Sequence, residues 1–369
     1  MQEIDAFVGL DVHKATIAVA LAEPARGGEV RRLGEIANEP EAVARLVRRL
    51  RKRHGRPEIV YEAGPCGYGL YRQINDLGVS CRIVAPSLIP RAAGDRVKND
   101  TRDAEKLARL LRAGELTFVW VPDPVHEAMR DLVRARHTAA RDVRQARSHV
   151  QMFLLRQGAR YEAKSWTMRH RVWLSDRRFD HPGQQIAFQS FLNRLEQAEA
   201  RKTELEAQIG EICEVWSLGP VVRAIQALKG VGPVIAATLV AEVGDFSRFE
   251  SPRKLMAYLG LVPGEHSSGR TVRPRGITKT GNSAARALLF EAAWSYRTTP
   301  KVGQWQQAHR PAVDQAFKDI AWKAQLRLYG RYRRLTARGK RNPVAITAVA
   351  RELVGFIWDI ARRTSPQLV

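Results

Sequence analysis

The chain has 369 residues, 44% of them hydrophobic, which is enough for two or three folded domains. Its formal net charge of +23 predicts a polyanionic partner, nucleic acid before an anionic membrane surface. No apolar run reaches the roughly 18 residues that a membrane span needs, because Glu242 interrupts the best candidate at 235–243, and the N-terminus lacks the basic start of a signal peptide.

The first third of the sequence alternates strand and helix patterns. We expect strands at 6–10, 16–21, 29–36, 57–61 and 81–84. Between them lie two amphipathic helical patterns, one that opens at Pro40 and one that carries Leu70, Tyr71, Ile74 and Leu77. This alternation predicts an α/β domain in which at least some strands pair in parallel.

Acidic residues stand at the ends of these predicted elements. Asp11 ends the first strand, Glu62 ends a later strand, and Asp100 and Asp103 open a helix in a basic stretch. Strand ends that meet at one edge of a sheet are where open α/β folds bind ligands, and paired carboxylates hold divalent cations. Each acid also has an ordinary structural interpretation, as a turn residue, a helix cap or a partner of the helix dipole.

The strand patterns stop at Val121–Pro124, where two prolines in three residues predict a domain boundary. Beyond it, two stretches at 132–153 and 195–216 carry apolar residues in steps of three and four, typical of helices that pack together or dimerise as a coiled coil. The first stretch presents Arg134, Arg141, Arg144 and Arg147 on its outer face. The residues between them, 158–189, show no firm period and are interpreted as an irregular arm or a helical tip.

The next motif is Leu228–Pro233, which holds Gly230 and Gly232 around one valine before an apolar helix at 234–243. This spacing suits the turn of a helix-hairpin-helix element, in which backbone N–H groups meet a phosphate. A tight turn between two buried helices is the alternative.

A glycine-flanked loop follows at 259–282, before a helix at 283–294. It contains Ser267 and Ser268 and four cations with few acids to balance them, Arg270, Arg273, Arg275 and Lys279. A hydroxyl in such a loop could reach a phosphate, although a serine in a loop is usually a turn residue.

The C-terminal segment is helical and basic. A helix is predicted at 316–328, followed by a basic run with two interleaved tyrosines that includes Arg331, Arg333 and Arg334. Either a solvated surface or a nucleic-acid contact has this composition. Asn342–Pro343 then begins a last amphipathic helix.

Five of these motifs in this order resemble the DEDD transposases of bacterial insertion sequences, the IS110 group, which are recombinases guided by a bridge RNA. The motifs are Gly9–Asp11, Tyr61–Gly64, Lys98–Ala104, Gly230–Gly232, and Leu259–Pro263 leading to Ser267–Gly269. The resemblance covers most of the chain and is weakest at 158–189 and in the C-terminal segment.

The resemblance implies three parts: a RuvC-like, RNase H-type catalytic domain at 1–122, a helical coiled-coil region at 123–217, and a helical transposase domain at 218–369. It implies that Asp11, Glu62, Asp100 and Asp103 hold Mg²⁺ or Mn²⁺. Ser268, five residues after Pro263 and directly before Gly269, matches the serine nucleophile.

The resemblance also implies the partners of the protein. These are donor and target DNA, a noncoding guide RNA, and a second copy of the chain in a dimer that assembles to a tetramer, with no membrane. The metal residues and Ser268 fall in different domains, so different subunits could contribute them to one site. Nucleic acid would contact Arg134, Arg141, Arg144, Arg147, Gly230, Gly232, Arg270, Arg273, Arg275, Lys279, Arg331, Arg333 and Arg334.

Cys66, Cys81 and Cys213 have no metal-ligand spacing and cannot all pair, which indicates a reducing cytoplasm. The resemblance implies that this cytoplasm is bacterial and that the protein associates with the nucleoid. Two other functions remain open at this point. A RuvC-like endonuclease would share every acidic residue and use water in place of Ser268, and a non-enzymatic nucleic-acid scaffold would use the acids as helix caps.

Overall fold

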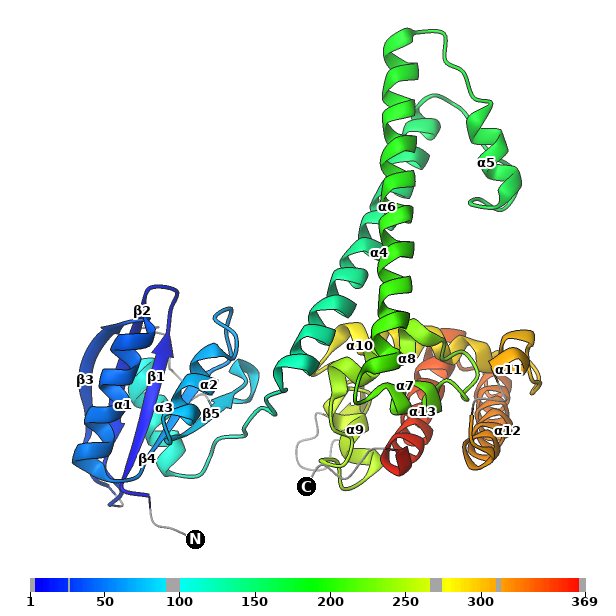
Figure 1. Cartoon of the computed structure of the whole chain (residues 1–369). Helices are drawn as coiled ribbons and strands as arrows, with labels where there is room; N and C mark the ends of the chain where they lie inside the picture. The colour runs from blue at the N-terminus through cyan, green and yellow to red at the C-terminus, as the bar shows by residue number, and fades with distance from the viewer. Residues whose placement is uncertain (1–3, 26, 91–99, 266–273, 310–312, 365–369) are drawn as a thin grey trace. The chain divides into compact units, whose positions relative to one another are not determined.

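The computed structural model describes residues 4–25, 27–90, 100–265, 274–309 and 313–364 (Figure 1). The side chains of 100, 101, 265, 274, 275, 305, 306 and 309 are also outside the description. The chain divides into two compact units, Met1–Pro122 and Asp123–Val369. In the described residues, no helix is both long and apolar enough to cross a membrane.

The first unit is built on a five-stranded mixed sheet in the order β3-β2-β1-β4-β5. The strands are β1 (Ala6–Val12), β2 (Thr16–Ala22), β3 (Val30–Ala37), β4 (Pro57–Glu62) and β5 (Ser80–Val84). β1, β2 and β3 pair antiparallel, whereas β1, β4 and β5 pair in parallel. The predicted strands and the parallel pairing are confirmed.

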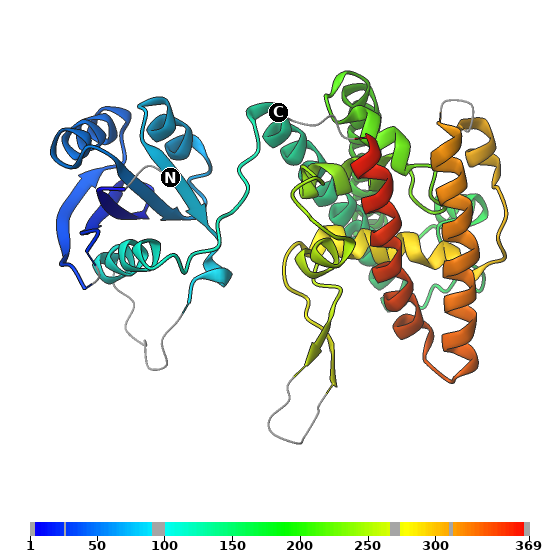
Figure 2. The same cartoon turned by 90° about the horizontal axis from the view of Figure 1, so that it is seen from below.

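Helices cover both faces of this sheet (Figures 1 and 2). α1 (Pro40–His54) and α2 (Gly69–Asp76) pack on one face, whose core includes Val8, Leu10 and Ile59, each at most 1% exposed. α3 (Asp100–Arg112) lies on the opposite face, where Leu107 and Leu111 pack against Val60. Burial of each such side chain contributes about 1.5–3 kcal/mol, so the two apolar faces fix which side of the sheet each helix covers.

The second unit begins with a long helical hairpin. α4 (Pro124–Arg156) and α6 (Pro182–Val215) pack side by side and antiparallel, joined by ion pairs such as Arg136 with Glu206 and Arg147 with Glu199 (Figure 1). Between them, α5 (Met168–Ser175) folds back, and Arg171 reaches Glu199 at 2.8 Å. Residues 158–189 therefore contain a short helix and the start of α6. The supercoil of a coiled coil stays a prediction.

The rest of the second unit is a helical bundle. It contains α7 (Gly219–Ile225), α8 (Pro233–Val243), α9 (Pro252–Tyr258), α10 (Ser283–Ala293), α11 (Gln304–His309), α12 (Gln315–Ala337) and α13 (Asn342–Thr364). α13 packs against α7, α9, α10 and α12. α12 continues through the basic run at 331–334, which the sequence placed after the helix.

A two-stranded sheet flanks the serine loop, where the sequence indicated only a loop. β6 (Pro263–Glu265) and β7 (Pro274–Ile277) pair antiparallel and extend from the bundle (Figure 2). Both strands are short and contain proline and glycine, so neither has a strand pattern that can be detected from sequence.

Candidate active site and nucleic-acid interface

Asp11 and Glu62 lie on the same face of the sheet, at the carboxyl ends of neighbouring parallel strands. Leu10 of β1 is in register with Tyr61 of β4, and Asp11 and Glu62 are the next residue on each strand. Because side chains alternate between faces, both acids share the face of Gly9 and Val60, the face that α3 covers. The side chain of Asp11 is 17% exposed, and Glu62 is exposed.

α3 runs antiparallel to β1, so its first turn lies toward the end of the strand that carries Asp11. Gly9 meets the backbone of Ala104 and Ala108, while Arg112 at the other end of α3 donates hydrogen bonds to the carbonyls of Glu23 and Gly28. Asp103 immediately precedes Ala104 and is partly buried. The fold thus brings the elements that carry Asp11, Glu62 and Asp103 to one edge of the sheet.

A metal site at this edge would have only oxygen donors, which suits a hard divalent cation. The side chain of Asp100, the fourth predicted ligand, lies outside the described residues, although its backbone begins α3. Among the described side chains, no three His, Cys, Asp or Glu are gathered closely enough to hold a metal ion. Asp11 and Glu62 therefore share a face and an edge, with the first turn of α3 brought toward them, but the three described acids do not form a closed cluster.

The cap interpretations are partly resolved at this edge. α2 begins at Gly69 with Tyr68 as its N-cap residue, so Glu62 does not cap it. Asp100 is the first helical residue of α3. The turn interpretation of Asp11 does not apply, because Asp11 is inside β1 and paired with Ala18.

His13 is a neighbour of the site that the sequence did not reveal. It lies in the turn between β1 and β2, and its Nε2 is 3.2 Å from Asp11 Oδ2. The sequence does contain a sign of this contact, because His13 is two residues after Asp11 and side chains two residues apart on an extended chain lie on the same side. His13 can therefore orient the Asp11 carboxylate.

Ser267, Ser268, Arg270 and Arg273 lie outside the described residues, as does the side chain of Arg275. The base of the hairpin that holds this loop is described, and it is tightly built. Thr278 N–H donates to the Val262 carbonyl at 2.9 Å, and Lys279 N–H donates to the Gly260 carbonyl at 3.0 Å. Arg286 of α10 donates to the carbonyls of Leu259 and Thr280.

A buried carboxylate ties the start of α10, just after the hairpin, to the long helix α4. Glu242 of α8 is 4% exposed and accepts two hydrogen bonds from Arg134, at 2.8 and 2.9 Å. Asn282 donates to the same carboxylate at 2.7 Å, and its side-chain oxygen accepts from Ala285 N–H as the N-cap of α10. Arg130 and His126 add hydrogen bonds to the Ala241 carbonyl. Burial lowers the pKa of His126.

The Gly230–Gly232 motif joins two packed helices, α7 and α8, as a helix-hairpin-helix element requires. Gly230 has φ +82°, and a Cβ there would lie 2.5 Å from the Ala292 carbonyl oxygen. Gly232 is the N-cap of α8 and has open space around its Cα. The tight-turn interpretation explains Gly230, and Gly232 leaves room for a phosphate.

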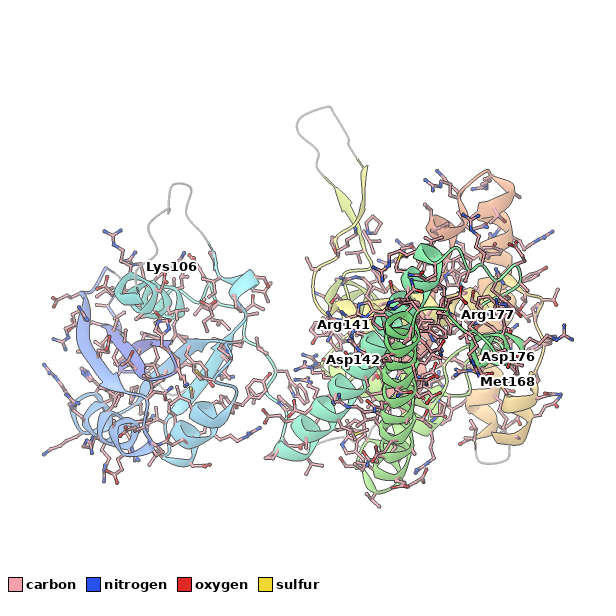
Figure 3. All side chains as sticks on the ribbon, turned by 90° about the horizontal axis from the view of Figure 1, so that it is seen from above. Lys106, Arg141, Asp142, Met168, Asp176 and Arg177 are labelled. Carbon is pink, nitrogen blue, oxygen red and sulfur yellow. The ribbon has the colours of Figure 1, made fainter. Side chains whose placement is uncertain are left out.

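The predicted nucleic-acid cations whose side chains the structure describes fall into two groups. Arg134, Arg147 and Arg331 have carboxylate partners within the chain, Glu242, Glu199 and Glu352 respectively. Arg147 also lies 5.0 Å from the centre of the Trp166 ring. The second group comprises Arg141, Arg144, Lys279, Arg333 and Arg334, which are exposed, as is Arg134 of the first group. Figure 3 shows Arg141 beside Asp142 on α4.

Comparisons with known proteins agree with this architecture. A family model described as a transposase of the IS110 DEDD type matches residues 8–157, and a model of the transposase IS116/IS110/IS902 family matches residues 222–310.

Two relatives match nearly the whole chain. A putative transposase, y4qE, of Sinorhizobium fredii is 52% identical over 97% of this chain and 89% of its own length. The transposase for insertion sequence element IS1533 of Leptospira borgpetersenii is 30% identical over 91% of this chain and 98% of its own length.

A mixed α/β sheet with acids at one edge, followed by a mostly helical unit, fits a DEDD transposase with an RNase H-like N-terminal domain. Such enzymes act on DNA, and the DEDD domain implies a divalent metal. The chain belongs to the IS110 family of transposases. One family model spans the first unit and α4, and the other lies within the second unit.

Proposed function

We propose that this transposase excises and inserts its own insertion sequence, guided by a noncoding bridge RNA, through a serine bound covalently to DNA. The observation that carries the proposal is that Asp11 and Glu62 share one face and one edge of the sheet, with the first turn of α3 brought toward them. That arrangement supports four carboxylates around one cation and opposes the scaffold alternative, in which they would be unrelated caps.

Asp11, Glu62, Asp100 and Asp103 would hold Mg²⁺, or Mn²⁺ in its place. When bound, the metal neutralises negative charge that develops on the scissile phosphate. His13 holds the Asp11 carboxylate in orientation, and the basic residues of α3, with Lys106 among them (Figure 3), favour the approach of a polyanion.

Ser268 supplies the nucleophile. Its Oγ forms a bond to the phosphorus, the bond between phosphorus and one sugar oxygen breaks, and the hydroxyl proton ends on that departing oxygen. The phosphoserine ester conserves the energy of the broken bond, so a sugar hydroxyl of a new DNA end can displace the serine and rejoin the strand. The acids and Ser268 lie in different units, and we propose that two subunits contribute them to one composite site.

The helical hairpin of α4 and α6 would form the coiled coil of a homodimer, two of which meet as a tetramer on donor and target DNA. Its exposed cations, with those of α12, would contact phosphates without reading sequence, while base pairing with the RNA selects the sites. Gly232 and the residues around it would contact a phosphate at the N-terminus of α8.

Denaturing gels of labelled DNA after reaction test the nucleophile. We expect a protein-linked DNA band with wild-type protein and with Ser267→Ala, and none with Ser268→Ala. If Ser268→Ala cuts DNA at the wild-type rate and no linked band forms, water is the nucleophile and the protein is an endonuclease. Asp11→Asn should bind DNA and fail to cut it; full recombination by this folded variant would remove the metal role.

Guidance by RNA has its own test. The purified protein is incubated with donor and target DNA in the presence or absence of a transcript of the noncoding sequence that flanks its gene. Recombination should require the transcript and should move to a new target when the complementary loop is rewritten. Equal recombination without RNA would contradict guidance.

A further inference from the structure

We propose that Gly9 is a positioning residue for the acidic site, because its lack of a side chain sets how closely α3 lies on β1. The inference rests on the metal role proposed above for Asp11 and Asp103. Gly9 has no reactive side chain, but it would set the distance between the strand that carries Asp11 and the helix that carries Asp103.

The approach of α3 to β1 leaves no room for a Cβ at position 9. An ideal Cβ there would lie 2.1 Å from the carbonyl oxygen of Ala104 and 2.6 Å from the amide nitrogen of Ala108. Both are backbone atoms of α3, so no side-chain rotation can relieve the overlap. Gly9 is not among the glycines with positive φ, so the position needs glycine for space and not for its backbone conformation.

Small residues continue this contact on the neighbouring strand. Ala20 of β2 pairs with Gly9, Ala18 pairs with Asp11, and both pack with Ala104 in a buried cluster in which each is at most 4% exposed. α3 therefore packs on glycine and alanine residues of β1 and β2. Its backbone lies nearer the sheet than larger residues would allow.

The far end of α3 is held independently. Arg112 donates from Nη1 to the carbonyls of Glu23 at 3.1 Å and Gly28 at 2.8 Å, both in the connection between β2 and β3. Asp103 and Asp100 are one and four residues upstream of Ala104, about 1.5 and 6 Å along the helix axis. Asp11 is two residues beyond Gly9, about 6.8 Å along the strand. A helix that tilts about Arg112 would move its acidic turn away from Asp11.

The size of the effect follows from the overlap. Moving the Ala104 carbonyl oxygen from 2.1 Å to the 3.0 Å below which real Cβ contacts essentially never occur requires a shift of about 1 Å. Misplacement of a catalytic group by about 1 Å costs about 100-fold in rate. Loss of an orienting contact around a metal site lowers metal affinity by about 10- to 100-fold.

Gly9→Ala tests the proposal in the full-length protein, with Gly69→Ala as the matched control. Gly69 is the first residue of α2 in the same unit, and a Cβ there meets nothing within 4 Å. Mn²⁺ affinity is measured calorimetrically without nucleic acid, and DNA affinity and DNA cleavage are measured separately. We expect Gly9→Ala to fold, to bind DNA normally, to bind Mn²⁺ at least about tenfold more weakly, and to recover part of its cleavage at high Mn²⁺.

Wild-type Mn²⁺ affinity and cleavage in a folded Gly9→Ala protein would overturn the proposal. If Gly9→Ala does not fold, Ala20→Val applies a milder pressure to α3 through a side chain, and it must weaken Mn²⁺ binding while Gly69→Ala does not. Asp11→Asn separates the two hypotheses: if that variant binds Mn²⁺ and cuts DNA like the wild type, the proposed metal role fails, whatever Gly9→Ala does.

Discussion

The ion pair between Arg134 and Glu242 gives the sharpest prediction about the second unit. Glu242 is 4% exposed, whereas the side chain of Arg134 is 57% exposed. Arg134→Ala would leave the buried carboxylate of Glu242 with Asn282 as its remaining side-chain hydrogen-bond donor among the residues that the structure describes. Removing one partner of a buried pair costs about 3–5 kcal/mol, and the exposure of Arg134 places this case near 3 kcal/mol.

Glu242→Gln should cost less than Arg134→Ala. The oxygen of the new glutamine side chain can accept hydrogen bonds from Asn282 and from one nitrogen of Arg134. The NH₂ group of the same side chain faces the other Arg134 nitrogen, which is also a donor, so one charge-assisted hydrogen bond is lost. That loss is worth about 1.5–3 kcal/mol, and Arg134 can then turn into water. Because both single changes break the same contact, the double variant should be about 2 kcal/mol more stable than the sum of the two costs predicts.

Tryptophan fluorescence during thermal or urea unfolding measures this effect in the right unit. Of the eight tryptophans, Trp120 alone lies before residue 123, so the other seven report on the second unit. Arg134→Ala should lower Tm by roughly 6–12 °C, from about 2–4 °C per kcal/mol for a unit of this size. Additive costs within about 0.5 kcal/mol would refute the coupling.

Three further predictions concern the helical hairpin of α4 and α6 and the helical bundle that follows it. Arg141→Ala should weaken DNA binding equally across sequences and reduce the slope of log affinity against log salt by about one, which filter binding measures; an unchanged slope would count against contact there. Gly230→Ala should destabilise the fold by about 2 kcal/mol or more, since it strains a positive φ and meets Ala292, while Gly232→Ala should change the urea midpoint little. Burial opposes ionisation of Glu199, but hydrogen bonds from Arg147 and Arg171 outweigh it and lower its pKa. The stability this adds is present above the ordinary carboxyl pKa and is lost as pH falls through the lowered pKa. Glu199→Gln should therefore be less stable than wild type at about pH 6, and the difference should shrink as pH falls through that lowered pKa.

Several features could be predicted because they depend on residues that are close together in the sequence. The strands of the first unit follow from short apolar runs, and Asp11 and Glu62 could be placed at strand ends from those runs alone. The start of the helix with Asp103 was visible in its amphipathic pattern. Local periodicity is sufficient here because each element has one apolar face that must be buried.

Other features depend on residues far apart in the chain. The hairpin of β6 and β7 forms through hydrogen bonds such as that from Thr278 to Val262, in segments with no strand pattern. The ion pair between Arg134 and Glu242 joins residues 108 apart, and Arg134 appeared from sequence to be a cation free for nucleic acid. A regular helical pattern identifies an outer face but not the neighbour that comes to cover it.

The sequence by itself determined the order of the elements, the acids at their ends and the glycine turn before α8, because each depends on residues close together in the chain. Only the tertiary structure decided that Asp11 and Glu62 share a face, since this depends on the register of two strands about 50 residues apart. It also decided that α3 lies directly on Gly9, because the small residues of β1 and β2 allow the backbone of α3 to approach the sheet closely.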